Sequence, residues 1–150
     1  MSKVTEYILT ETFSLQQIKD TMYAQQAMYN EGLQNKDIDG LISALGSFST
    51  VLGLVFTAPT PAAVGGAIAA LISTLGSNDL PNLKDIVEDG YWDLGSVEHW
   101  MEQNEQYDII KLRIGFLDYK DEGIRFVQHT GTQYIDEVHS IDGGWHTSNR

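Results

Sequence analysis

The sequence predicts an α+β fold with an N-terminal amphipathic helix, a central apolar helical hairpin and a C-terminal three-stranded antiparallel meander. Apolar residues recur at helical spacing after Phe13, an uncharged stretch runs from Gly40 to Asn78, and the apolar period falls to two after Tyr107. A chain of 150 residues is expected to form a single domain. Its expected segments are 1–39 (strand and amphipathic helix), 40–78 (apolar helical hairpin), 79–106 (short acidic helices) and 107–150 (β-meander).

The N-terminal segment combines a strand pattern with a helix start. Val4 to Leu9 is β-branched and aromatic, as is typical of a strand. Ser14 and Gln17 have the spacing of a capping box, in which each side chain bonds the other residue's backbone N–H. We therefore expect a helix from Leu15 to about Asn30, with Gly32 as its terminator.

The central stretch predicts two helices joined by a turn. The first is expected from about Ile38 to Thr57. Pro59 and Pro61 break it, because proline lacks a backbone N–H and disfavours helix in the residue before it. Pro61 suits the first turn of a second helix that ends at Gly76.

Two sets of residues in this hairpin are candidates for its function. The candidate membrane-inserting or oligomer-core residues are the large apolar residues of both arms and the two prolines: Leu45, Phe48, Leu52, Val55, Phe56, Pro59, Pro61, Val64, Ile68, Leu71 and Leu75. The candidate helix-packing residues are small: Ser49, Gly53, Gly65, Gly66, Ala69 and Ala70. Small residues four apart let two helix backbones approach closely, as they do in lipid.

Charge is absent from Gly40 to Asn78, whereas the flanking segments are rich in acidic residues. A soluble bundle helix normally carries one charged face, and neither arm has one. The arms are short for a permanent span, since about 20 residues cross the hydrocarbon layer. The hairpin is therefore expected to bury itself conditionally, in lipid or against a partner copy.

The segments after the hairpin predict short helices and then strands. Asn82 to Asp89 is expected to form one acidic helix closed by Gly90, and Ser96 is expected to cap another ending near Glu102. Alternating apolar residues then indicate the buried face of a first strand: Ile110, Leu112, Ile114 and Phe116. Further strands are expected at 124–128 and 134–141.

Composition excludes several classes of function. A formal net charge of −12 opposes binding to nucleic acid, because phosphate recognition needs a basic face. The absence of cysteine excludes a disulfide framework and a thiolate nucleophile. The first residues contain no apolar run, so a secretory signal is not expected. A soluble form would then be cytoplasmic or exported by a non-classical route.

Candidate metal and catalytic groups give no complete motif. Asn35, Asp37 and Asp39 match the first half of a calcium loop, but Gly46 occupies the position where a bidentate glutamate is needed. A helix cap formed by Asp37 or Asp39 is the alternative. Several further polar residues gather near the C-terminus: His129, Asp136, Glu137, His139 and His146. Their spacing matches no zinc or hydrolase signature, so no catalytic residue, metal or cofactor is predicted.

The stretch Val64-Gly-Gly-Ala-Ile-Ala-Ala-Leu71 and its paired arm resemble the hydrophobic hairpins of α-helical pore-forming toxins and pore-forming colicin domains. The resemblance covers residues 40–78 only. It implies a soluble protein that buries the hairpin and inserts it after a trigger.

Three functional hypotheses follow from the sequence. The favoured one is a non-enzymatic, toxin-like, membrane-perturbing or pore-forming protein with a conditionally inserting hairpin, acting as a homo-oligomer. The alternative is a self-assembling structural or interaction protein, such as a filament, shell or immunity-type partner, whose hairpin is the oligomer core. An enzyme using the segment from His129 to His146 ranks last.

Overall fold

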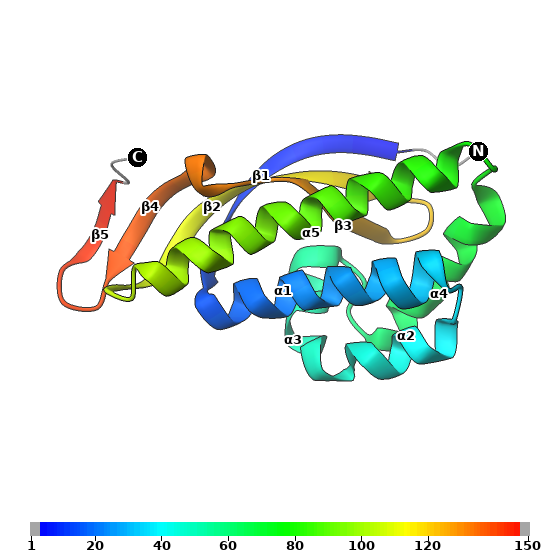
Figure 1. Ribbon diagram of the computed structural model, residues 1–150, viewed down its shortest axis with the longest axis horizontal. Coiled ribbons are helices and arrows are strands. Elements are labelled where there is room, and N and C mark those ends of the chain that lie inside the picture. Colours follow the sequence, from blue (N-terminus) through cyan, green and yellow to red (C-terminus); the bar gives the residue numbers. More distant parts are fainter. Residues whose placement is uncertain (1–3, 148–150) are drawn as a thin grey trace.

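Helices pack on an antiparallel sheet in this computed structural model, which describes residues 4–147 (Figure 1). In chain order the elements are β1 (Val4–Ser14), α1 (Leu15–Ala27), the π-helical η1 (Met28–Gln34), α2 (Ile38–Leu45), the 3₁₀ turn η2 (Gly46–Phe48), α3 (Ser49–Val51), the π-helical η3 (Leu52–Phe56), α4 (Pro61–Thr74), α5 (Asp79–Gln103), β2 (Tyr107–Tyr119), β3 (Ile124–His129), the 3₁₀ turn η4 (Thr132–Tyr134), β4 (Ile135–Ser140) and β5 (Gly144–Thr147). The predicted mixture of helices and antiparallel sheet is confirmed.

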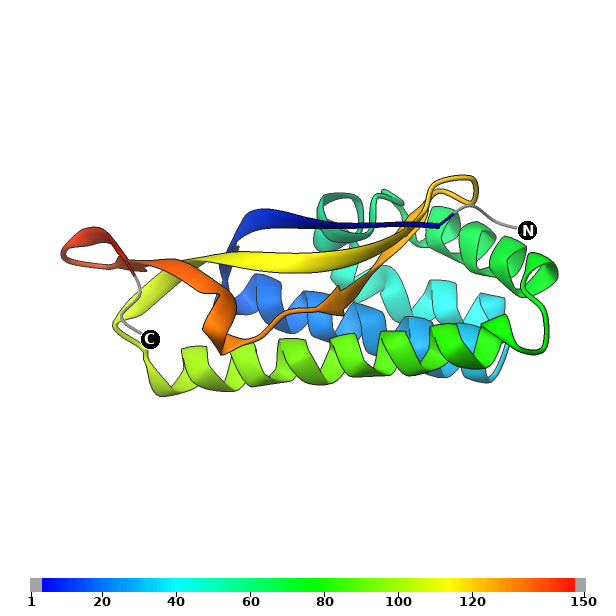
Figure 2. The same ribbon diagram turned by 90° about the horizontal axis from the view of Figure 1, so that it is seen from above.

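Strand β2 forms the centre of the sheet (Figure 2). Strand β1 pairs with it along one side, while β3 and β4 share the other side and β5 extends from β4. The strand predicted at Val4–Leu9 is present as part of β1, whereas the predicted three-stranded meander is wrong, since β4 returns to β2 and since β1 and β5 join the same sheet. Alternating residues reveal that a segment is a strand, but they do not reveal which neighbour it pairs with.

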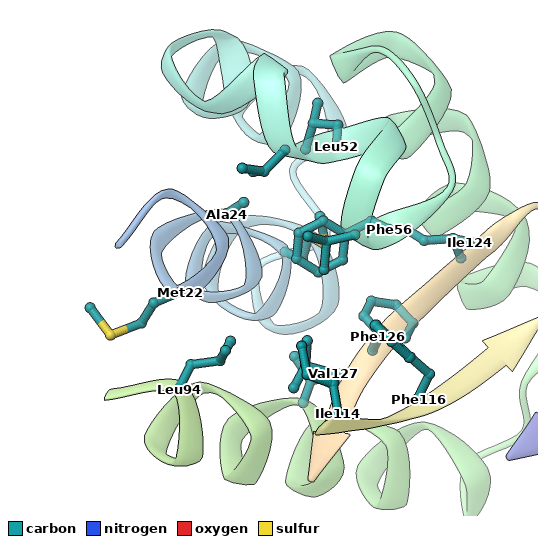
Figure 3. Packing of buried hydrophobic residues seen from close by; sticks show 14 of the residues in the cluster. Met22, Ala24, Leu52, Phe56, Leu94, Ile114, Phe116, Ile124, Phe126 and Val127 are labelled. Carbon is teal, nitrogen blue, oxygen red and sulfur yellow. The ribbon is translucent and has the colours of Figure 1, made fainter. Parts of the chain in front are cut away.

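The inward face of β2 was predicted correctly. Ile110, Leu112, Ile114 and Phe116 are all fully buried, and they join Phe13 of β1 in the main apolar core. Figure 3 shows how this core continues from the sheet to the helices. The side chains that meet there come from α1, η3, α5 and the strands: Met22, Ala24, Leu52, Phe56, Leu94, Ile114, Phe116, Ile124, Phe126 and Val127.

The first helix begins as predicted but continues further. The Ser14 hydroxyl accepts from the Gln17 N–H at 3.2 Å, and the Gln17 side chain accepts from the Ser14 N–H at 2.9 Å, which confirms the capping box. The prediction that Gly32 ends the helix is wrong, because the chain passes through it as the π-helical η1. A Cβ there would lie 3.0 Å from Cγ2 of Ile68, so Gly32 serves close packing against the hairpin.

The two short acidic helices predicted at 79–106 are in fact one helix, α5, of 25 residues. It passes through Gly90 and Gly95 without a break. Each glycine weakens a helix by about 1 kcal/mol relative to alanine, so packing of α5 along the sheet outweighs local propensity.

The hairpin has two arms joined by a turn at residues 57–60. The second arm is the regular helix α4, with Thr60 as its N-cap and Pro61 in its first turn, as expected. The first arm, α2 to η3, is divided into α-helical, 3₁₀ and π-helical pieces. Hydrogen bonds of these two minor helix types are less favourable than those of an α-helix, so the first arm is the less regular one.

Candidate functional site

The hairpin buries one face and leaves the other at the surface. Its large residues fall into three groups: Leu45, Leu52, Val55, Phe56, Val64, Ile68 and Leu71 are buried; Phe48, Pro61 and Leu75 are half-buried; Pro59 is exposed. In Figure 3, Phe56 lies beside Phe126 of β3, which shows where the first arm meets the sheet. The apolar face of the hairpin is thus part of the core of this fold.

The small residues are divided between the inside and the outside of the hairpin. Gly65 faces the other arm, where a Cβ would lie 2.7 Å from Cγ1 of Ile42, and Gly53 lies against Pro59. Gly66 has no neighbour within 4 Å and is exposed, as is Ser49. The remaining two, Ala69 and Ala70, are half-buried.

The outward face of the first arm carries a single charge, Asp39 in its first turn, and is incompletely covered. The helical segment Ile38–Phe56 has 19 residues. Its apolar stretch has a mean hydropathy of 1.6, and only 28% of that stretch is buried. Leu54 is its most exposed large side chain, at 43%. Apart from Leu54, the exposed positions of this arm carry small, hydroxyl or acidic side chains: Asp39, Ser43, Ala44, Gly46, Ser47, Ser49, Thr50 and Gly53.

A buried arginine holds the end of the first arm on the sheet. Nε of Arg125 on β3 donates to the Val55 carbonyl at 2.6 Å, and an η nitrogen donates to the Leu54 carbonyl at 3.1 Å. Only 7% of Arg125 is exposed. Carbonyl groups at the C-terminal end of a helix lack helical partners and carry partial negative charge, so a cation stabilises them.

The charge of Arg125 is balanced by a polar chain on neighbouring strands. Its other η nitrogen contacts the Tyr7 hydroxyl at 3.2 Å, and that hydroxyl donates to the carboxylate of Asp118. Burial, aided by the contact with Asp118, raises the pKa of Tyr7 above its usual value, so the phenol stays neutral and keeps its proton to donate. The guanidinium also lies 3.9 Å from the centre of the Phe116 ring.

The sequence contains a signal for this anchor that was missed. Asp118 and Arg125 are directly opposite each other in the β2–β3 hairpin. Both occupy positions among buried residues, where a charge requires a partner. The signal was therefore an acid and an arginine at opposed positions of two otherwise apolar strand segments, and in the structure the Tyr7 hydroxyl links the two.

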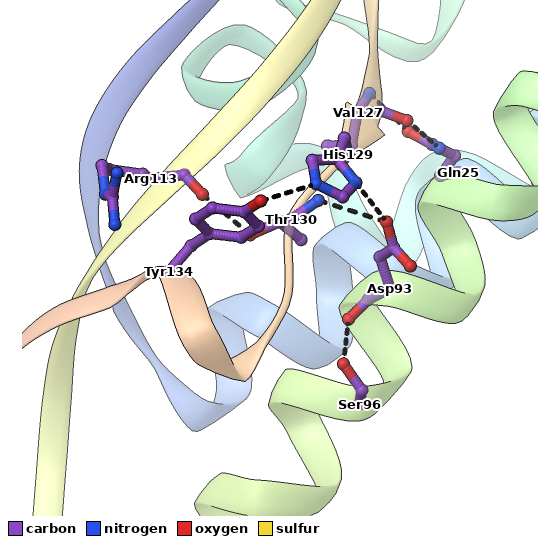
Figure 4. A network of polar contacts seen from close by, with 8 residues as sticks. All are labelled: Gln25, Asp93, Ser96, Arg113, Val127, His129, Thr130 and Tyr134. Carbon is purple, nitrogen blue, oxygen red and sulfur yellow. Dashed lines mark hydrogen bonds and ion pairs between the residues drawn. The ribbon is translucent and has the colours of Figure 1, made fainter. Parts of the chain in front are cut away.

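A second polar feature lies where the β3–β4 connection crosses α5 (Figure 4). His129 Nδ1 is 3.2 Å from the Asp93 carboxylate, and His129 Nε2 is 3.1 Å from the Tyr134 hydroxyl. The Asp93 carboxylate also accepts from the Thr130 N–H at 3.2 Å. These contacts fix the imidazole and tie the connection to α5.

A cavity of about 560 Å³ opens beside this chain of contacts. Residues of β1, β2, β3 and η4 line it: Glu6, Tyr7, Ile8, Arg113, Gly115, Gln128, His129 and Tyr134. Its polar groups already have partners, because Gln128 donates to Glu6 at 2.8 Å within the lining and Arg113 donates at 2.9 Å to Asp136, which lies outside the lining.

No family model, curated protein or solved structure matches the chain.

The polar residues singled out near the C-terminus do not converge on one site. His139 pairs with Asp108 at 2.6 Å, and this contact lowers the pKa of Asp108. His146 contacts Ser140, whereas Glu137 pairs with Lys111 at 3.3 Å. Within residues 4–147, no three histidine or acidic side chains are grouped so as to hold a metal ion.

The incomplete calcium pattern forms a helix cap. The Asp37 carboxylate accepts from the Gly40 N–H at 3.0 Å at the start of α2. Asn35 donates to Glu31 at 3.0 Å. Asp37 is thus the N-cap of α2, which was the alternative to a calcium loop in the sequence analysis.

Proposed function

We propose that this protein perturbs membranes by inserting its apolar hairpin, Gly40–Asn78, into a bilayer after a trigger, without catalysis. One observation carries the proposal. The first arm of the hairpin, Ile38–Phe56, is long and apolar enough to cross a membrane, and only 28% of its apolar stretch is buried in the fold. After Asp39 the arm carries no charge, and its open face consists mainly of small and hydroxyl side chains with Leu54, so the arm can enter a bilayer without burying a charge.

The length of the first arm is close to that of a membrane span. As a straight α-helix, the 17 uncharged residues from Gly40 to Phe56 would be about 26 Å long, slightly less than the hydrocarbon thickness of about 30 Å. The second arm, Pro61–Thr74, has 14 residues and is about 21 Å long, so it would cross only part of the hydrocarbon layer. Gly65 already lets the arms approach closely in the soluble form, and such contacts also hold helices together in lipid.

The local backbone supports a change of conformation at the tip. Thr57, the residue that ends η3, has a φ of 63°. A β-branched side chain in this left-handed region is strained by about 1–2 kcal/mol. Refolding of the first arm into one regular helix would relieve this strain and replace the 3₁₀ and π-helical bonds.

Release of the hairpin requires the loss of its contacts with the sheet. Arg125 bonds the Leu54 and Val55 carbonyls, so it holds the arm in the soluble form. Once this anchor opens, the buried apolar face of the hairpin becomes available to lipid. Acidic residues beside the hairpin, Asp37, Asp39 and Asp79, would remain at the membrane surface because a carboxylate at bilayer depth costs several kcal/mol.

Dye release from phosphatidylcholine vesicles tests the proposal. The folded wild-type protein is expected to release dye, at neutral or acidic pH, and Leu54→Glu is expected to reduce the rate at least about tenfold. Leu54 is partly exposed, so the soluble fold should tolerate the change. Ile141→Glu is the matched control, since Ile141 is 67% exposed and lies outside the hairpin.

Retention of the dye by folded wild-type protein at both pH values would sink the proposal, as would equal release by Leu54→Glu. A large assembly whose mass is unchanged by lipid would instead support the alternative, in which the hairpin is the core of a self-assembling protein.

A further inference from the structure

The two long edges of the sheet are treated differently by the fold. On the β3 edge, the side chain of Gln25 accepts from the Val127 N–H and donates to the Val127 carbonyl, both at 2.8 Å. The amide of Gln25 thus takes the place of a neighbouring strand, and α5 closes over the same position at Gly90. The β3 edge is therefore covered.

The β1 edge is open. Strand β1 pairs with β2 through its full length, and no other strand within residues 4–147 pairs with its far side. Figure 2 looks onto this edge, and no ribbon of the described chain passes over β1. Alternate backbone N–H and C=O groups of an edge strand point away from the sheet, so they are free to pair with another strand.

Apart from the two acidic side chains Glu6 and Glu11, strand β1 lacks the features that protect natural edges from pairing. Over Val4–Ser14 it contains no lysine, no proline and no bulge in its ladder. Three of its apolar side chains are exposed: Val4 at 47%, Ile8 at 69% and Leu9 at 37%. A long and regular edge with exposed apolar side chains at its centre is suited to β-strand addition.

We propose that β1 pairs in antiparallel orientation with β1 of a second copy, with Ile8 on the two-fold axis. This register gives nine paired positions per strand, residues 4–12. It places Ile8 against the partner's Ile8 on the outer face of the joined sheet. Glu6 then lies opposite the partner's Thr10, so no two acidic side chains face each other across the new ladder.

A second copy fits this edge for reasons of symmetry. An antiparallel pair of identical strands about a two-fold axis satisfies both open edges at once and stops at a dimer. The exposed Ile8 side chains would cover each other, which removes the most exposed large apolar side chain among the described residues. The joined sheet would then continue from one protomer to the other through β1.

The net charge gives this interface a distinctive response to salt. Two copies that each carry a charge of −12 repel each other, and this repulsion is screened as ionic strength rises. The dimer is therefore expected to become tighter with added salt. By contrast, a different protein whose strand placed basic residues opposite Glu6 and Glu11 would bind more weakly as salt is added.

Sedimentation velocity on the full chain, without lipid, tests the proposal. The wild-type protein is expected to reach twice its chain mass of 16.7 kDa as concentration rises, and Ile8→Lys is expected to remain at the chain mass. This variant places two lysines next to each other at the two-fold axis. Ile141→Lys is the matched control, because it changes a residue of nearly equal exposure outside the sheet edge and should leave the dimer intact.

Circular dichroism of each variant would establish that its fold is retained. A wild-type protein that stays at the chain mass at all concentrations and salt levels would overturn the proposal. A dimer that resists Ile8→Lys, or that Ile141→Lys disrupts equally, would overturn it as well, since either result places the interface elsewhere.

Discussion

Replacing Arg125 with leucine is expected to lower the free energy of unfolding by about 3–5 kcal/mol, as is typical when one member of a buried charged network is removed. The variant leaves the Leu54 and Val55 carbonyls without their arginine donor. It also leaves the carboxylate of Asp118 buried without a balancing cation. Urea denaturation followed by circular dichroism at neutral pH measures the change.

Arg113→Leu is the matched control. Arg113 also lies on a strand, pairs with an aspartate (Asp136, at 2.9 Å) and stacks on a tyrosine ring, but its side chain is 44% exposed. Exposed ion pairs contribute up to about 1 kcal/mol, so the loss should be several times smaller than for Arg125→Leu. Similar losses for the two arginines would contradict the anchor. A weakened anchor should also speed dye release from vesicles.

Gly90→Ala, which adds a methyl group, is expected to lower the free energy of unfolding by about 2–4 kcal/mol. Its Cβ would lie 1.9 Å from the Val127 carbonyl oxygen and 2.5 Å from the Nε2 atom of Gln25. The helix must therefore move away from β3, which breaks the buried hydrogen bonds of Gln25. The gain in helix propensity, about 1 kcal/mol, is too small to compensate.

Gly95→Ala separates this effect from helix propensity. Gly95 lies on the same helix, and its Cβ would be 3.6 Å from the Met22 sulfur, an ordinary contact. Alanine at 95 is expected to be neutral or to stabilise by up to about 1 kcal/mol. Thermal unfolding should therefore show a lower midpoint temperature for Gly90→Ala and an unchanged or higher midpoint temperature for Gly95→Ala. Equal shifts would show that α5 does not depend on its approach to β3.

Local signals in the sequence predicted the local parts of the fold. The capping box at Ser14, the buried alternation in β2 and the start of α4 at Pro61 each depend on residues close together in the chain. Such features are set by backbone hydrogen bonding and by side-chain periodicity, so they can be read without knowledge of distant partners.

Features that depend on distant contacts were predicted wrongly or missed. The glycines at 32 and 90 looked like helix ends, whereas each lies inside a helical segment that packs closely on a distant element. Strand order failed for the same reason, since the pairing of β4 with β2 is set by packing. Arg125 was missed because its carbonyl partners, on Leu54 and Val55, are about 70 residues away.

The most direct test of the hairpin account is a fluorescent label at its tip. The chain has no cysteine, so Ala62→Cys would accept a thiol-reactive, polarity-sensitive dye at one position only. Residue 62 is exposed at the start of α4, next to the turn that is expected to enter the bilayer first. Ile141→Cys, on the exposed β4–β5 turn, provides the matched control.

On addition of phosphatidylcholine vesicles, the dye at residue 62 is expected to brighten, shift to shorter wavelength and be quenched by a quencher attached to the lipid chains. The dye at residue 141 should show none of these changes. An unchanged spectrum at residue 62, in folded protein at neutral and acidic pH, would contradict insertion of the hairpin.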